Sequence, residues 1–448
     1  MEGALGGLVE NTMIRVLRYP GLKAEKFLGS LLSRMERYPL KLEKKVANIG
    51  REVKAKGDLA LCEFTFKFDE VSLKPEEFRV SEEEIERSYQ QIEPELLSAI
   101  KLAVTKVRSF HSKTLPKSWF DSSEDGCLLG QLIRAVDSAG LYIPGGKGGE
   151  TPLISTVIMT AVPAKLAGVK KVIMCSPPRS DKSLHPALLV AGKEAGVDEI
   201  YRIGGPWSIF AMAYGTETIP KVDVICGPGN IYVTLAKKLV AFQVGIDLLA
   251  GPSEVLIVAD NKADPDFVVW DLLAQAEHDP LSMSVLITTS EKLVKEVKVK
   301  IKEALSKKFR SEIVLQALRN RGAIFKVNTL EEAIELANRI APEHLELIVE
   351  NPESYLPLIK NAGAIFLGAY TPEAVGDYMA GPNHVLPTMG LARFTGGLSV
   401  EQFLKKINFM KYSPQALKRE SQSIITLALN ENLPSHAEAV RIRLKNIT

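Results

Sequence analysis

The chain of 448 residues is too long for one compact core, and its 46% hydrophobic and 25% charged residues are ordinary for a soluble globular protein of two or three domains. Lys and Arg number 56 against 54 Asp and Glu, a net charge of +2, which gives no indication of a nucleic acid partner. The one long basic run, 291–310, mixes both signs at helical spacing and is typical of a solvated helix face.

The chain also lacks the marks of a membrane or secreted protein. No segment approaches the roughly eighteen consecutive apolar residues of a membrane helix, and residues 1–21 lack the basic head and apolar run of a signal peptide. The cysteines are far apart and form no CxxC pair, which argues against a disulfide framework and a zinc knuckle. We therefore expect a cytoplasmic protein that does not contact a membrane.

The first 140 residues are mostly helical and charged in pattern. We expect residues 1–41 to form an N-terminal helical segment. Residues 42–141 are expected to join 255–398 in a first α/β domain, which would carry most of the candidate site residues.

Short β-branched runs alternate with helical stretches of 10 to 15 residues from about 151 to 260, and again from about 263 to 370. This alternation is typical of βαβ units and parallel sheets. We expect 142–254 to form a second α/β domain. After a Gly-rich join, 399–448 returns to a helical pattern and is expected to be a C-terminal helical segment.

The stretch "DLLAQAEHDP", residues 271–280, places three polar side chains in an apolar helix that we expect to begin after Asp264. At 100° per residue, Gln275 and His278 share a face and Glu277 points away. Gln275 and His278 could be hydrogen-bonded core residues or ligands of a metal. Because zinc accepts nitrogen and oxygen ligands where no thiolate is available, the additional ligands could be Asp377 in "VGDYMAG" and His436 in "LPSHAEAV".

Glu343 and His344, in "APEHLE", follow a helical pattern and precede a strand pattern. A carboxylate beside an imidazole suits general acid and base catalysis, although a surface dipeptide is an equal alternative. The Gly-rich loops 142–150 and 226–234 could approach a phosphate, but neither fits a known nucleotide motif. Ser253, in a turn before a strand, could contact a ligand or only the backbone.

In this order, "YIPGG", "GPGN", "AGPSEVLIVAD", "DLLAQAEHDP", "APEHLEL", "YTPEAVGDYMAGPNHVLPT" and "HAEAVRIR" closely resemble the histidinol dehydrogenase family, from about residue 30 to the C-terminus. The resemblance implies two Rossmann-like α/β modules with parallel-rich sheets, like those of aldehyde dehydrogenases. Small helical segments would stand at the two ends.

The resemblance also implies a set of site residues. Glu343 would activate water, and His344 would act as acid and base. One zinc ion per subunit would be held by Gln275, His278, Asp377 and His436. The substrate would contact these ligands and His344, together with Ser253, His384 and Glu431. NAD would contact Tyr142 and Asn230.

By the same resemblance, L-histidinol would be oxidised through a bound aldehyde to L-histidine, the last steps of histidine biosynthesis, with two NAD consumed. A homodimer would share its active sites, with Glu431 and His436 reaching into the partner.

One position departs from the family pattern: the chain has "GGPWS" where "GGAQA" is usual, so Trp207 replaces a cofactor-contacting Gln and could stack on a cofactor ring. The alternatives are a paralogous zinc- and NAD-dependent dehydrogenase of another small polyol, such as a sulfonated propanediol, and a non-catalytic metal- or nucleotide-binding protein. Glu431 favours histidinol, because an imidazole needs a further polar partner.

Overall fold

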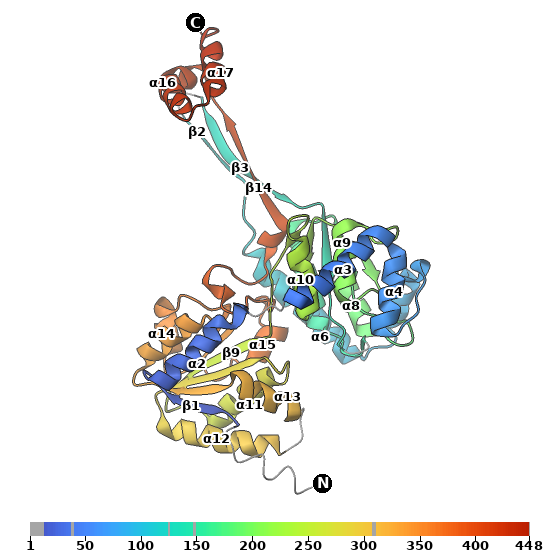
Figure 1. Cartoon of the computed structure of the whole chain (residues 1–448), viewed down its shortest axis with the longest axis vertical. Coiled ribbons are helices and arrows are strands. Elements are labelled where there is room, and N and C mark those ends of the chain that lie inside the picture. Colours follow the sequence, from blue (N-terminus) through green and yellow to red (C-terminus); the bar gives the residue numbers. More distant parts are fainter. Residues whose placement is uncertain (1–12, 37–39, 124–125, 147–148, 307–310, 448) are drawn as a thin grey trace.

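The structure is a computed structural model that describes residues 13–36, 40–123, 126–146, 149–306 and 311–447. The first twelve residues of the expected N-terminal segment, residues 147–148 of the loop 142–150 and residues 307–310 of the basic run lie outside the described residues. Figure 1 shows two α/β units and a long arm that extends away from them. The expected pair of α/β modules is confirmed.

The first unit contains a parallel sheet for which six strands are described, in the order β1-β11-β10-β9-β12-β13. The strands are β1 (Arg15–Arg18), β9 (Glu254–Ala259), β10 (Met283–Thr288), β11 (Ala323–Lys326), β12 (His344–Ile348) and β13 (Ala364–Leu367). Val255 and Ile257 of β9 face one layer of helices, and Leu256 and Val258 face the other, as the twofold repeat of a strand requires.

Helices therefore cover both faces of this sheet. One layer contains α11 (Pro265–Ala276), α12 (Glu291–Leu305) and α13 (Ser311–Arg321), and the other contains α2 (Leu22–Leu32) and α14 (Leu330–Ile340). Every residue of β9 is buried, as is typical of a central strand in a parallel sheet. Catalytic groups placed on such a strand have little freedom to move.

The second unit contains a parallel sheet with five described strands, in the order β6-β5-β4-β7-β8. The strands are β4 (Ser138–Tyr142), β5 (Lys171–Cys175), β6 (Glu199–Tyr201), β7 (Val224–Cys226) and β8 (Gly245–Ile246). On one face lie α3 (Leu40–Lys56), α4 (Asp58–Asp69), α9 (Gly205–Tyr214) and α10 (Ile231–Val240), and on the other α5 (Glu82–Ser88), α6 (Pro94–Ser112), α7 (Ile154–Ala167) and α8 (Pro186–Ala195).

Two parts of the expected domain division differ from these contacts. The helices within 42–141 pack against the second sheet, because buried residues such as Val46 and Val53 of α3 meet α9 and α10, rather than joining 255–398. In the N-terminal segment, Arg15–Arg18 is a strand that pairs in parallel with β11 and so extends the first sheet. Helical periodicity alone does not identify the sheet that a helix covers.

The arm is a third, antiparallel sheet that the helical interpretation of the ends missed. It consists of β2 (Trp119–Ser122), β3 (Leu128–Ala135) and β14 (Leu404–Lys411), and it leads to α16 (Pro414–Asn430) and α17 (Pro434–Leu444) at its outer end (Figure 1). The sequence pattern indicated that the first 140 residues are mostly helical and that 399–448 is a helical segment, and it predicted no strand in either part of the arm. None of the described helices is both long and apolar enough to cross a membrane.

Candidate active site

Glu343 and His344 lie at the junction between α14 and β12, where the sequence placed them. The helix ends at Ile340, Ala341 adopts a left-handed φ of 53°, and His344 is the first residue of β12. The two side chains are buried, with exposed fractions of 7% and 3%. A surface dipeptide is thereby excluded.

The Glu343 carboxylate accepts two hydrogen bonds from the turn that enters β9. Ser253 Oγ donates to Oε2 at 2.6 Å, and the backbone N–H of Glu254 donates to the same oxygen at 2.8 Å. Burial nevertheless raises the pKa of Glu343 to about 7. A carboxyl group with a pKa in this range can accept or donate a proton near neutral pH.

The His344 ring faces the backbone of Glu254, the first residue of β9. Its Nδ1 lies 3.0 Å from the carbonyl oxygen of Glu254 and 3.6 Å from Glu373 Oε1. Burial lowers the pKa of His344, but the carboxylates of Glu373, Glu343 and Asp377 outweigh this effect and raise it to about 9. Because a carbonyl only accepts, Nδ1 carries a hydrogen and Nε2 is the atom at which a proton can be exchanged.

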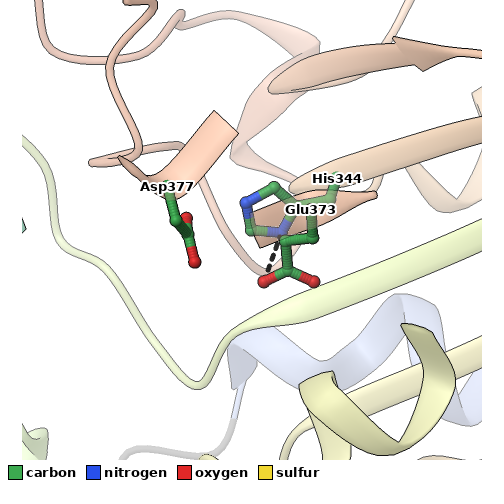
Figure 2. A group of neighbouring side chains, drawn as sticks. All are labelled: His344, Glu373 and Asp377. Atoms are coloured by element: carbon green, nitrogen blue, oxygen red, sulfur yellow. Dashed lines mark ion pairs between the residues drawn. The ribbon is translucent and has the colours of Figure 1, made fainter. Parts of the chain in front are cut away.

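Glu373 and Asp377 lie one turn apart on α15 (Glu373–Tyr378), and Figure 2 shows both beside His344. One candidate ligand atom from each of the three residues lies within 4.8 Å of the others. Burial raises the pKa of Glu373 to about 8. The sequence interpretation missed Glu373, although its position four residues before Asp377 in "PEAVGD" places both on one helix face.

Gln275 is fully buried on α11, and within the described chain neither its amide oxygen nor its amide nitrogen has a hydrogen-bond partner. An orphaned buried amide costs about 1–3 kcal/mol, so its presence favours a role in binding a ligand. Glu277 caps the end of the helix and is exposed. The helical wheel therefore distinguished these two residues correctly.

His278 lies beyond the end of α11 and is exposed, so the wheel does not describe its position. Burial lowers the pKa of His384, and His278 is close enough to contribute in the same direction. His384 in turn lies near Asp377, with 3.7 Å between Nδ1 and Oδ1, and its Nε2 is 3.4 Å from Thr156 Oγ1. Asp377 and His384 thus stand together, with His278 near them.

Glu431 and His436 lie apart from this group. Glu431 follows α16 and His436 is in the first turn of α17, and both are exposed at the outer end of the arm (Figure 1). The structure therefore places His278 and Asp377 near His384, whereas His436, the fourth expected ligand, lies on the arm.

The three residues expected at the cofactor line one cavity of about 850 Å³ in the second unit. Tyr142 ends β4, and Asn230 caps α10 by accepting from the N–H groups of Tyr232 and Val233. Trp207, on α9, stacks on Phe68 with ring centroids 5.4 Å apart. The cavity is within the size range of small-molecule sites.

Two buried polar atoms beside this cavity lack a hydrogen-bond partner within the described chain: Trp207 Nε1 and Asp69 Oδ2. Gly227, in the loop before α10, has a φ of 119°, and a Cβ there would lie 2.1 Å from the carbonyl oxygen of Tyr142. This loop of "CGPGN" therefore requires glycine at that position.

A model of the histidinol dehydrogenase family matches residues 32–444. The chain belongs to the histidinol dehydrogenase family. It is 52% identical over 400 residues to the histidinol dehydrogenase of Thermosynechococcus vestitus, covering 89% of this chain and 92% of that protein. It is 47% identical over 433 residues to that of Clostridium acetobutylicum, covering 97% and 99%.

A crystal structure of histidinol dehydrogenase from Elizabethkingia anophelis has the same fold, with a TM-score of 0.90, 37% sequence identity, and coverage of 97% of this chain and 98% of that one. Histidinol dehydrogenases are oxidoreductases of histidine biosynthesis, and the family assignment makes this chain one of them. These similarities favour an enzyme over the alternative of a non-catalytic binding protein.

Proposed function

We propose that the chain oxidises L-histidinol through bound L-histidinal to L-histidine, with two NAD consumed and with one zinc ion in each active site. The observation that carries this proposal is the buried Glu343 and His344 pair, which meets Glu373 and Asp377 within one cluster. Family membership gives the reaction, and the cluster supplies the acid and base that it needs.

The residues present fit a divalent cation. Glu373, Asp377 and His344 each offer an oxygen or nitrogen donor within 4.8 Å of the others, and Glu343 lies beside the same imidazole. Gln275 adds an amide with no partner in the described chain. Gln275, His278 and Asp377 would hold zinc together with His436 of a second copy. A positive charge at Asp377 would oppose the carboxylates that raise the pKa of His344 and so free Nε2 to act as a base.

When bound, NAD would supply the hydride acceptor for the two oxidations, and zinc would serve to orient the substrate. Nε2 of His344 takes the proton of the alcohol as the first hydride leaves. Glu343 then removes a proton from water as the water oxygen adds to the aldehyde carbon, and His344 returns its proton to the aldehyde oxygen. The neutral His344 can then take a proton from the resulting hydrate as the second hydride leaves. Ser253 keeps the Glu343 carboxylate oriented through its hydrogen bond.

The substrate would lie against the same cluster. His384, held beside Asp377 and Thr156, would contact the substrate together with Ser253 and the zinc ligands. Glu431 of the second copy would bind the substrate imidazole.

The cavity of the second unit would take the cofactor. Tyr142 and Asn230 would contact NAD, and the Trp207 indole would stack on one of its rings rather than accept a hydrogen bond as Gln does. The unpartnered Nε1 and the neighbouring Asp69 Oδ2 favour a ligand that offers both acceptors and donors.

The yield of NADH per histidinol tests the reaction. We expect two equivalents, loss of activity on chelation and its return with zinc. A sulfonated propanediol is the comparison substrate, and NADH from it but none from histidinol would overturn the proposal in favour of a paralogous enzyme.

We also propose a homodimer in which the arm of each copy completes the site of the other. Mixing Glu343→Gln chains with His436→Ala chains tests this arrangement. A mixed dimer would have one intact site, so random mixing should restore about a quarter of wild-type activity, and no restoration would contradict a shared site. A chain with both substitutions, mixed with the Glu343→Gln chain, is the control and should remain inactive.

A further inference from the structure

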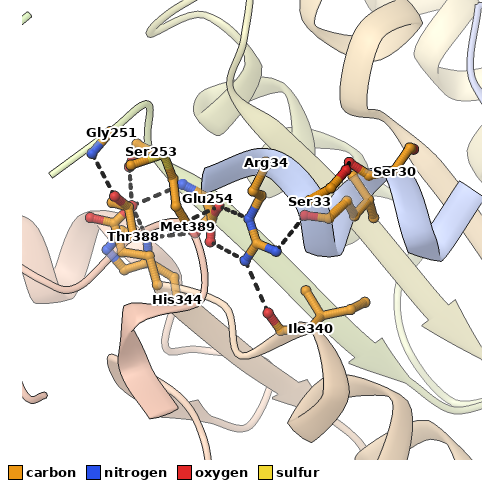
Figure 3. Close-up of polar contacts among 12 residues, drawn as sticks. Ser30, Ser33, Arg34, Gly251, Ser253, Glu254, Ile340, His344, Thr388 and Met389 are labelled. Atoms are coloured by element: carbon orange, nitrogen blue, oxygen red, sulfur yellow. Dashed lines mark hydrogen bonds and ion pairs between the residues drawn. The ribbon is translucent and has the colours of Figure 1, made fainter. Parts of the chain in front are cut away.

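Arg34 and Glu254 form a buried ion pair behind Glu343 and His344. Arg34 is 4% exposed and Glu254 is fully buried at the start of β9 (Figure 3). The contact is bidentate, with 2.6 Å from Nε to Oε1 and 3.1 Å from Nη2 to Oε2. This geometry gives a carboxylate both attraction and a fixed orientation.

The remaining polar groups of the pair are also satisfied by backbone. Arg34 donates to the carbonyl oxygens of Leu31 at 2.7 Å and Ile340 at 2.9 Å, and Glu254 Oε1 accepts from the N–H of Met389 at 3.0 Å. The pair therefore links the end of α2, the end of α14 and the loop at Met389 to the central strand. The carbonyl of Ile340 stands three residues before Glu343.

A buried ion pair is a weak explanation of stability, because well-packed apolar residues often stabilise a core equally well. Its position suggests another role. The backbone N–H of Glu254 donates to Glu343 Oε2, and its backbone carbonyl faces His344 Nδ1. One residue thus orients both members of the catalytic pair through its backbone, while its side chain is held by Arg34.

We propose that Arg34 and Glu254 are positioning residues: by fixing the backbone of Glu254, they hold the Glu343 carboxylate in place and keep the hydrogen of His344 on Nδ1. This inference rests on the proposed function only for its kinetic consequences. The orientation of the two side chains can be measured without turnover.

The principal test is the double variant Arg34→Met/Glu254→Gln, which removes both charges and leaves no buried charge unpaired. We expect kcat to fall by about tenfold to a hundredfold while the KM values for histidinol and NAD change less than about threefold. The pH profile of kcat should also shift, because the catalytic groups lose their fixed partners. A folded variant with wild-type kcat and pH profile would overturn the proposal.

Nitrogen NMR of histidine-labelled protein gives a second readout, with the His344→Asn variant used for assignment. At a pH above the pKa of His344, the wild-type chain should show hydrogen on Nδ1 of the neutral ring, and the double variant should show a mixture of the two tautomers. An unchanged tautomer would overturn the role assigned to the pair. Wild-type protein that shows the expected tautomer but oxidises no histidinol would refute the proposed reaction and leave this inference standing.

Arg34→Lys covers the case in which the double variant does not fold, since it keeps the charge and loses the planar fork. A lower kcat with unchanged KM would support the proposal, and wild-type kcat would overturn it. Glu25→Gln is the matched control. Glu25 joins α2 to α14 through Arg339, at 2.9 and 3.0 Å, without touching Glu254, so its loss should leave kcat and the tautomer unchanged.

Discussion

The two halves of the candidate site differ in how complete they are within one chain. Around Glu343 and His344, Ser253 and the backbone of Glu254 supply hydrogen-bond partners, and strands fix the geometry. In the other half, Gln275 has no partner within the described residues, and His436 stands on the arm. The proposed acid and base are therefore organised by folding, whereas the proposed metal site would be completed by groups from outside the chain.

Removing His344, the proposed acid and base, should have the largest effect on activity. His344→Asn should lower kcat by about 10²- to 10⁴-fold with little change in KM, because His344 is the group proposed to take the substrate proton. Steady-state rates with histidinol measure it. Glu277→Gln is the control: Glu277 is the exposed carboxylate of "DLLAQAEHDP", and the variant should remain active. A His344→Asn variant with more than a tenth of wild-type kcat would remove His344 from this role.

Gln275→Met should separate function from stability in the metal half. We expect zinc affinity to fall by about tenfold to a hundredfold, because an amide ligand is lost. Without metal, the variant should be as stable as the wild-type chain or more so, because a buried amide without a partner is replaced by an apolar group of similar length. Zinc titration and urea unfolding of the metal-free proteins check the two expectations. A destabilised variant with normal zinc affinity would show that Gln275 is a structural residue.

Glu373 joins the two halves, because it contacts His344 and lies one turn from Asp377. Glu373→Gln keeps the shape and replaces the carboxyl group beside His344 with an amide that cannot exchange a proton, so we expect kcat to fall by about tenfold and the zinc affinity to fall less. Steady-state kinetics at saturating zinc separates the two effects. Glu335→Gln, on α14, is the control. If the two substitutions lower kcat equally, the carboxyl group of Glu373 has no particular role.

A second buried histidine, His111, shows what burial does to a histidine pKa when, unlike at His344, carboxylates do not raise it. His111 is 2% exposed, neither ring nitrogen has a partner within the described chain, and burial lowers its pKa to about 4. Since the pKa in the unfolded chain is about 6.5, the unfolded state binds the extra proton first. Stability should therefore fall by about 1–3 kcal/mol as the pH decreases from about 6.5 to 4.

Urea unfolding of the wild-type chain and of His111→Leu, measured between pH 7.5 and pH 5, tests this expectation. The variant should lose less stability over this interval. Parallel losses in the two proteins would mean that another group causes the acid sensitivity.

The alternation of helical and β-branched runs predicted both α/β units, because parallel strands buried on both faces have continuous apolar sequences. The arm escaped prediction for the opposite reason. Its strands have mostly exposed residues, such as Phe120 and Met410, and their pairing joins segments far apart in the chain. The helices of 42–141 were assigned to the wrong sheet because an apolar helix face does not specify its partner.

In the site, periodicity separated buried Gln275 from exposed Glu277 without family information. It failed for His278, because the helix ends at Ala276, before that residue. Glu373 and Glu254 were not found, since a buried carboxylate is recognisable in a sequence only when its partners are known. For Glu254 the partner is Arg34, 220 residues away.

The exposed position of Glu431 and His436 at the end of the arm has a thermodynamic consequence. If zinc binds across two copies, metal binding and association are linked equilibria, and each must strengthen the other by the same factor. The apparent zinc affinity should then rise with protein concentration. Dilution of the enzyme would release metal with no change in the solution other than the number of chains.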